Sequence, residues 1–309
     1  MIEIVKNTNI KFTKYMPGAA IVSAIMVVAS IILAATKMEY GVDFRGGAEI
    51  QVKFQQAVSL ETVREDMEKN GFKGVVVQTI GEASDNEVLI KAQGDESNLN
   101  QITEQVNQAV TKDFSSQGAE VIKVDVVGPK AGKQLRLSGF QAMLWAMIAI
   151  MIYVALRFDF KYAPGAIVAL FHDVSIVLGV YAITGTEFTL QTVAALLAVI
   201  GYSVNDTVII YDRVRENEQK SPGLPLANHI DSACNETLAR TILTSGTTIL
   251  VSIVMFFIGG PAIHDFFLAI TIGIIVGTYS STFIAAPVTL IFNHFRSQKA
   301  QKVGDAVKA

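Results

Sequence analysis

The sequence predicts a polytopic α-helical membrane protein with six transmembrane helices and an α+β domain inserted after the first. Hydrophobic residues make up 51% of the 309 residues and charged residues only 17%, below the quarter that is usual in soluble domains. Six apolar runs reach the roughly 20 residues that cross a hydrocarbon core of about 30 Å. The polar stretch 37–137 separates the first run from the other five.

The first apolar run covers residues 15–36 and follows Lys6, Lys11 and Lys14. We interpret it as an uncleaved anchor, because it is long for a signal peptide and its Ala-Ala-Thr end is a poor cleavage site. A signal peptide is the alternative. The other runs form a predicted bundle over 138–293, with spans at 138–156, 163–184, 190–211, 240–259 and 266–293 and a loop at 212–239.

Lysine and arginine placement predicts the orientation. These residues occur in the N-terminal segment 1–14, between the second and third spans, in the loop 212–239 and in the tail 294–309. The short loops around 185–187 and 260–265 contain neither. By the positive-inside rule, we expect both termini in the cytoplasm and the polar segment 37–137 in the periplasm or its equivalent.

The polar segment has the pattern of a small α+β domain. Strands are expected at 48–54, 75–80, 87–92 and 120–127, with a turn over 81–86. One helix is expected at 59–71, with Ser59 as N-cap and Asn70-Gly71 at its end. A second follows from Leu99, Ile102, Val106 and Val110, which share one helical face. The order βαββαβ is that of a ferredoxin-like sandwich.

Several function classes are excluded by composition. A net charge of −3 with no basic block argues against nucleic-acid binding. The single cysteine, Cys234, excludes an intramolecular disulfide, and the four histidines lack zinc-ligand spacing. The motif GVDFRGG at 41–47 lacks the Lys-Ser/Thr of a phosphate loop and precedes a strand. We therefore expect no enzyme activity, metal or cofactor.

Polar residues inside the predicted spans carry the functional signal. His172-Asp173 lies midway through the third span, Asn205-Asp206 lies in the fourth, and Arg240 opens the fifth. Hydroxyl residues follow at steps of three and four on one face, namely Thr241, Thr244, Ser245, Thr248 and Ser252. Charged groups within a bilayer are costly, so each needs a partner or a function.

Two interpretations of this polar seam remain open on the residues alone. A desolvated carboxyl group such as that of Asp206 can load and release a proton, and a nearby arginine can switch it. Alternatively, Asp206 pairs with Arg240 or bonds to its neighbours to lock helices together, and Arg240 could instead pair with Glu236. For His172-Asp173 the structural interpretation, a satisfied polar pair, is favoured.

Seven motifs resemble the SecD/SecF family of membrane proteins, and most of them its SecF branch. They are GVDFRGG (41–47), VGPKAG (127–132), FHDV (171–174), YSVNDTV (202–208), DRVREN (212–217), RTILTSGTT (240–248) and GTYSS (277–281). The motif positions with an expected structural role are Gly41, Asp43, Gly46, Gly47, Gly128, Pro129 and Gly132. The family in turn resembles half of a resistance-nodulation-division transporter.

The resemblance implies an auxiliary subunit of the Sec protein translocase in the bacterial inner (plasma) membrane. Together with a SecD homologue, such a subunit uses the proton-motive force to assist export of unfolded preproteins through the SecYEG channel, with YajC and YidC as further partners. Only a proton is implied as coupling ion. The motif positions assign Asp206, Arg240 and Asn205 to the proton relay and leave His172 and Asp173 as a secondary polar pair.

Two other functions compete with this one. A proton-driven small-molecule or lipid exporter of the resistance-nodulation-division superfamily would share the seam, but such exporters usually carry both six-helix halves in one chain. A purely structural bundle that anchors a sensing domain would explain the outer domain and leave the polar seam without purpose.

Overall fold

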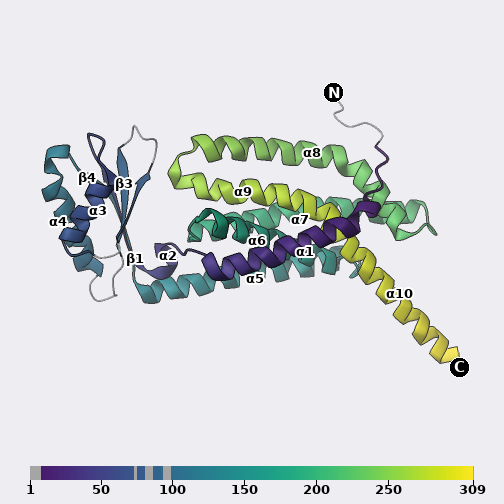
Figure 1. Ribbon diagram of the computed structural model, residues 1–309. Helices are drawn as coiled ribbons and strands as arrows, with labels where there is room; N and C mark the ends of the chain where they lie inside the picture. Colours follow the sequence, from purple (N-terminus) through teal and green to yellow (C-terminus); the bar gives the residue numbers. More distant parts are fainter. Residues whose placement is uncertain (1–7, 73–74, 81–85, 93–98, 309) are drawn as a thin grey trace.

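The computed structural model describes residues 8–72, 75–80, 86–92 and 99–308, and it consists of a long helical bundle with a small α+β domain at one end (Figure 1). Within the described residues, six helical segments are long and apolar enough to cross a membrane, as predicted. Five are α1 (Phe12–Lys37), α5 (Pro129–Arg157), α6 (Ala163–Thr184), α7 (Leu190–Lys220) and α8 (Leu226–Ile258). The sixth joins α9 (Pro261–Ser280), the π-helical turn η2 (Ser281–Ala285) and α10 (Ala286–Lys308).

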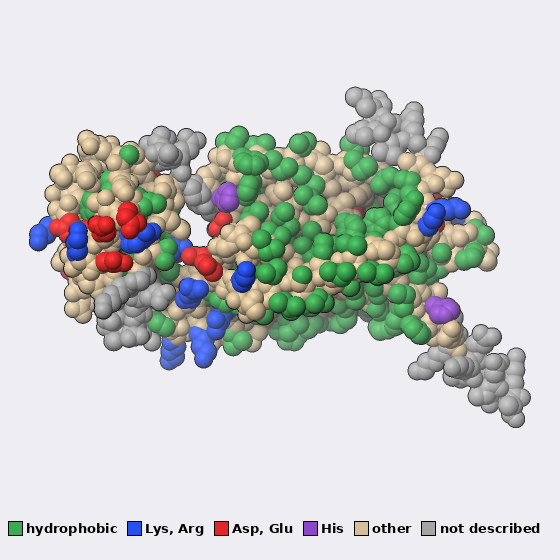
Figure 2. All heavy atoms as spheres, viewed as in Figure 1, with side chains coloured by type: hydrophobic (Ala, Val, Ile, Leu, Met, Phe, Trp, Pro, Cys, Tyr) green, Lys and Arg blue, Asp and Glu red, His purple; other side chains and the backbone are tan. Residues whose placement is uncertain are grey.

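The two ends of the bundle differ. The start of α1 and the end of α10 both lie away from the α+β domain (Figure 1). Charged side chains gather over the domain and near the ends of the bundle, and hydrophobic side chains cover the surface between (Figure 2). Large apolar side chains such as Ile25, Leu250 and Phe257 point outward there. A surface of this kind is suited to lipid and not to water.

Two predicted boundaries are wrong. The loop expected at 212–239 is helical over most of its length, because α7 continues to Lys220 and α8 begins at Leu226. Buried Val214, Ile230 and Ala233 pack these polar extensions against the bundle. Likewise α5 begins at Pro129, inside the segment expected to be domain. Proline favours the first turn of a helix, so the chain becomes helical earlier than its hydrophobicity indicates.

The domain has the predicted ferredoxin-like arrangement. Its elements are a short helix α2 (Val42–Arg45), β1 (Gly47–Lys53), α3 (Leu60–Lys69), β2 (Val76–Ile80), β3 (Glu87–Ala92), α4 (Leu99–Asp113), the 3₁₀ turn η1 (Ser115–Gln117) and β4 (Glu120–Val127). The described strands form an antiparallel sheet in the order β2-β3-β1-β4. Ser59 occupies the N-cap of α3 without a side-chain capping bond. Of the turn expected over 81–86, only Asn86 is described.

The core of the domain follows the two sequence periods. Alternate residues of the central strands, Ile50 and Ile90, are fully buried on one face of the sheet. Val63 and Met67 of α3 and Val106 of α4 pack against that face. The buried residues of the strands, which alternate, and those of the helices, which are three or four apart, thus pack in one cluster. This cluster gives the domain a core that is separate from the bundle.

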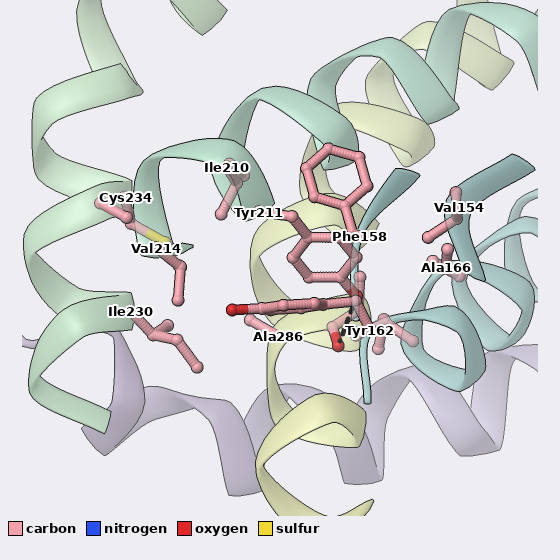
Figure 3. Packing of buried hydrophobic residues seen from close by; sticks show 14 of the residues in the cluster. Val154, Phe158, Tyr162, Ala166, Ile210, Tyr211, Val214, Ile230, Cys234 and Ala286 are labelled. Carbon is pink, nitrogen blue, oxygen red and sulfur yellow. Dashed lines mark hydrogen bonds between the residues drawn. The ribbon is translucent and has the colours of Figure 1, made fainter. Parts of the chain in front are cut away.

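The bundle core farthest from the domain is built around two tyrosines (Figure 3). The rings of Tyr162 and Tyr211 lie 4.7 Å apart, and the Tyr211 hydroxyl donates to the Ala285 carbonyl at 3.2 Å. A Cβ at Gly165 would lie 2.3 Å from that hydroxyl. The close approach of α6, α7 and η2 at this level therefore depends on a glycine.

Helix α9 packs most closely on α7, as its Gly-x-x-x-Gly pattern indicates. A Cβ on Gly273 would lie 2.3 Å from Cγ2 of Val199, and one on Gly277 would lie 2.9 Å from Cβ of Ser203. The two backbones therefore approach closely in the middle of the bundle. This brings polar side chains of α6, α7, α8 and α9 together.

Candidate functional site

Asp206 lies on α7 and is 5% exposed. Its Oδ1 accepts a hydrogen bond of 2.7 Å from the Thr241 hydroxyl on α8. Its Oδ2 is buried and has no hydrogen-bond partner among the residues that the structure describes. A buried polar atom without a partner is costly. The open oxygen is therefore a natural place for a proton to bind, since a protonated carboxyl group needs fewer donors than a carboxylate.

Arg240 precedes Thr241 on α8 but forms neither of the ion pairs considered from the sequence. Within the described chain, no contact of 4.0 Å or less joins it to Asp206 or Glu236, and Glu236 instead pairs with Arg213 at 3.3 Å. The helix lock through a direct Asp206–Arg240 ion pair is therefore not formed here.

A cavity of about 280 Å³ opens beside Arg240, between the end of α5 and helices α7 and α8. Its lining includes Arg157, Asp212, Arg213, Glu216, Glu236 and Thr237. Both signs of charge occur in this lining, so the cavity can hold water. Arg240 therefore lines a polar cavity.

The structure does not bring Asn205 into this contact. Its side chain is exposed on α7, whereas Asp206 and Thr207 are buried. The Thr207 hydroxyl lies 2.8 Å from that of Ser281 in η2. The two halves of the Asn-Asp pair thus point to different faces of the helix, as neighbouring helical residues do.

Asp173 occupies a second polar centre, where α6, α7 and α9 meet. It is fully buried, and its Oδ2 accepts hydrogen bonds from Ser203 at 2.6 Å and Ser280 at 2.9 Å. Its Oδ1 lies 2.9 Å from Nδ1 of His172. The sequence predicted the His-Asp pair but missed both serines. They stand in the motifs YSVNDTV and GTYSS, whose small residues were the available signal.

The hydroxyl stripe on α8 faces the interior over most of its length. Ser245 lies 2.8 Å from Thr278, Thr271 donates to Ser252 at 3.0 Å, and Tyr202 donates to Thr248 at 3.4 Å. The exception is Thr244, which is exposed and bonds to the Arg240 carbonyl of its own helix. Apart from Thr241, which bonds to the Asp206 carboxyl group, the stripe therefore joins α8 to α7 and α9 through contacts between neutral hydroxyls.

The glycine motif at 41–47 forms the junction between domain and bundle. Gly46 has φ +81°, and a Cβ there would lie 2.6 Å from Cα of Pro129 at the start of α5. A Cβ on Gly132 would lie 3.0 Å from the Gly46 nitrogen. Gly47 begins β1, and Gly128 is the N-cap of α5. The two motifs therefore pack directly on each other.

The same junction reaches α7. Asp43 accepts a hydrogen bond of 2.9 Å from the Leu190 N–H in the first turn of that helix. A Cβ on Gly41 would lie 2.6 Å from Cγ2 of Thr189, the N-cap of α7. The rings of Phe44 and Phe188 stack at 5.4 Å. The helix that carries Asp206 is thus anchored to the base of the outer domain.

An ionic contact adds to this anchor. Lys91 of β3 lies 2.5 Å from Glu187, in the α6–α7 connection, and 3.6 Å from Glu49 of β1. Burial raises the pKa of Glu49 above its ordinary value, although Lys91 lowers it, and Glu187 adds a further rise. Lys91 therefore forms ion pairs with two carboxyl groups, one on each side of the junction.

These features define a class: a multi-pass membrane protein with a ferredoxin-like domain after its first span and buried carboxyl groups in later spans. Two family models match the sequence of this chain. The model "Protein export membrane protein SecD/SecF, C-terminal" covers residues 105–294, and "SecD/SecF GG Motif" covers residues 31–58. The chain belongs to the SecD/SecF family.

Relatives and solved structures agree with this assignment. The chain is 39% identical to the protein translocase subunit SecF of Vibrio alginolyticus, over 94% of this chain and 92% of that one. It is also 39% identical to the subunit of that name from Magnetococcus marinus, over 93% of each chain. It superimposes on the translocon-associated membrane protein SecDF of Thermus thermophilus with TM-score 0.77 and 34% identity, over 91% of this chain and 38% of the longer SecDF chain.

Proposed function

We propose that this chain is the SecF-type subunit of a bacterial protein translocase and uses the proton-motive force, with a SecD partner, to assist preprotein export. The relatives named above are protein translocase subunits, which favours this function over small-molecule or lipid export. The chain spans about two fifths of the SecDF chain from Thermus. A separate SecD homologue would supply the other half of the assembly.

The observation that carries the proton step is the half-satisfied carboxyl group of Asp206. Thr241 holds Oδ1 at 2.7 Å, which fixes the carboxyl group between α7 and α8 while Oδ2 stays open. A proton that binds Oδ2 removes the charge from a buried site. Approach of the neighbouring Arg240 favours release of that proton, because a cation stabilises the carboxylate.

The anchor of α7 suggests how proton binding reaches the outer domain. Leu190 at the start of α7 is bonded to Asp43 of the glycine junction, and Glu187 just before it contacts Lys91 of β3. A shift of α7 against α8 would therefore move the base of the domain. In this proposal the domain acts on the preprotein outside the cytoplasm, and the chain itself performs no covalent chemistry.

The remaining assignments belong to the same proposal. The subunit would lie in the inner membrane with both termini in the cytoplasm, as the lysine and arginine pattern indicates. SecYEG would be the channel that it assists, with YajC and YidC as neighbours. Asn205, exposed on α7 beside Asp206, would contribute to the relay from the surface that faces the SecD half.

The test is Asp206→Asn in membrane vesicles that contain the complete translocase. Asparagine keeps the shape and the bond to Thr241 but cannot carry the proton, so export driven by an imposed proton gradient should be lost. Asp159→Asn, an exposed carboxyl group outside the spans, is the matched control and should export normally. Normal export by Asp206→Asn, at wild-type protein level, would sink the relay assignment.

A further inference from the structure

The His172–Asp173 pair has one atom that its structural role leaves unexplained. Nδ1 of His172 faces Oδ1 of Asp173 at 2.9 Å, but Nε2 is buried and has no hydrogen-bond partner among the described residues. His172 is only 3% exposed. A satisfied polar pair would leave neither ring nitrogen open in so buried a place.

The charge of the pair is also uncompensated. With a neutral imidazole that donates from Nδ1, the pair carries the single negative charge of Asp173. The groups that contact this carboxyl group from α7 and α9 are the neutral hydroxyls of Ser203 and Ser280. A buried charge without an opposite charge is unstable. One proton on Nε2 would turn the pair into a neutral imidazolium–carboxylate ion pair.

Among the residues that the structure describes, the surrounding helices bring no other cation to the pair. Tyr279 of α9 is the titratable side chain beside the imidazole, and Asp206 follows Ser203 by three residues on α7 but bonds toward α8. The charged residues of α1, α5 and α9 stand near the ends of those helices, away from the middle of α6. They are Lys14, Lys37, Lys130, Lys133, Arg136, Arg157 and Asp265. In α10 the charged residues begin only at Arg296.

The aromatic neighbour fits a protonated ring. The rings of Tyr279 and His172 lie 6.0 Å apart at 32°, and aromatic faces attract cations at about this distance. The Tyr279 hydroxyl is already engaged, at 3.1 Å from the Ala19 carbonyl and 3.0 Å from the Ser23 hydroxyl. Tyr279 therefore contacts the imidazole through its ring and not through its hydroxyl.

We propose that the His172–Asp173 pair is a second proton-binding site of the bundle, which takes up one proton on Nε2 of His172. The inference goes beyond the proposed function, because it adds a proton site that the proposed export step through Asp206 does not use. The site differs from Asp206 in its helices: it joins α6, α7 and α9, whereas Asp206 joins α7 and α8. Ser203 and Asp206, one turn apart on α7, connect the two.

The chain contains a matched control for this site. His264 and Asp265 form the same adjacent pair, with Nδ1 3.0 Å from Oδ1, but their side chains are 44% and 45% exposed. The corresponding values for His172 and Asp173 are 4% and 0%. The two pairs share this contact but differ in burial and in the serine bonds to Asp173, so a comparison tests the effect of the buried setting as a whole.

The experiment is imidazole ¹⁵N NMR of the full-length protein, labelled at histidine, from about pH 5 to 9, a range that brackets ordinary histidine titration. Variants His172→Gln and His229→Gln identify the two buried resonances, and a soluble paramagnetic agent broadens those of exposed His264 and His294. We expect the His172 ring to pass from one to two protonated nitrogens within this range. In Asp173→Asn the doubly protonated form of the His172 ring should be lost at a pH where the wild type shows it, whereas Asp265→Asn should leave it in place.

A His172 resonance that keeps a single neutral tautomer over the whole range would overturn the inference. So would an unchanged transition in Asp173→Asn, because the carboxylate would then not stabilise the cation. If His172→Gln does not fold, the paramagnetic agent and His229→Gln still assign the remaining buried resonance. Neither result bears on the Asp206→Asn export test, so the two proposals fail separately.

Discussion

The hydroxyl of Thr241 lies 2.7 Å from Oδ1 of Asp206 and joins α8 to α7 at a buried carboxyl group. This contact, and not an ion pair with the adjacent Arg240, holds the carboxyl group in place. It leaves Oδ2 open. A neutral donor orients the carboxyl group but does not hold it in the charged form. A site that binds and releases a proton requires this freedom.

The first prediction tests this bond. Thr241→Val keeps the shape but removes the donor, so Oδ1 loses its partner and neither carboxyl oxygen is then bonded. Hydrogen bonds to charged groups contribute about 1.5–3 kcal/mol. We expect proton-driven export to fall about tenfold or more, and Thr241→Ser, which keeps a hydroxyl, to remain near wild type. Export by vesicles with matched protein levels measures both. Equal activity of the two variants would contradict the role given to the hydroxyl.

The partners of the polar residues were harder to predict than the residues themselves. The cost of charge in a bilayer singles out Asp173, Asp206 and Arg240 from the sequence. It does not say that Asp206 turns toward Thr241, or that Ser203 bonds to Asp173. Those contacts depend on how each helix is rotated about its axis. That rotation is set by packing between helices, such as the close approach of Gly273 and Gly277 to α7, and involves many residues at once.

The domain was predictable because its two periods are distinct. Alternating strands and helical faces fix the order βαββαβ, and the described sheet agrees with it. The ends of α7 and α8 were missed for the opposite reason. Their polar turns look like a loop by hydropathy, and only contacts of Val214 and Ile230 with distant helices make them helical.

The second prediction concerns the glycine junction. Gly46 and Gly71 both have positive φ, at +81° and +93°, but only Gly46 lies against another backbone. A sparsely populated backbone conformation with positive φ costs a residue with a side chain about 1–3 kcal/mol, and overpacking adds about 1–3 kcal/mol. Gly46→Ala should therefore lower the melting temperature of the purified protein clearly more than Gly71→Ala does. Equal losses would mean that the contact with Pro129 can relax.

The third prediction concerns independent folding of the outer domain. Residues 40–128 contain the whole sheet and both covering helices and end before Pro129, where α5 begins. We expect this fragment to be soluble, with a mixed α+β circular dichroism spectrum and a cooperative melt. Val106→Ala, which removes a fully buried side chain of α4, should lower the midpoint. A fragment without a cooperative transition would show that the domain depends on the bundle.

The fourth prediction concerns orientation. The positive-inside rule puts the tip of the α7–α8 connection, near Pro222, in the cytoplasm and the domain outside. Gly71 and Pro222 are both exposed in turns, so an inserted reporter should be tolerated at either. A reporter that is active only outside the cytoplasm should work at Gly71 and fail at Pro222. The reverse pattern would invert the whole topology.

The last prediction concerns pH and the ionic contact at the junction. Burial raises the pKa of Glu49, against the effect of Lys91. Between the ordinary pKa of a glutamate, about 4.3, and the raised one, the folded protein binds more protons than the unfolded chain. The contribution of Glu49 to stability is therefore greatest at low pH, and it falls as pH rises through the raised pKa.

Glu49→Gln removes this dependence, because glutamine stays neutral at every pH. We expect the variant to melt at a higher temperature than wild type at pH 7, with the difference shrinking as the pH approaches 4. Scanning fluorimetry of the purified full-length protein across this range measures it. Glu61→Gln is the control, since Glu61 is 64% exposed and its ion pair within the described residues is with Arg64 of its own helix. If Glu49→Gln instead lowers the melting temperature at pH 7, the contact with Lys91 outweighs the cost of burying the charge.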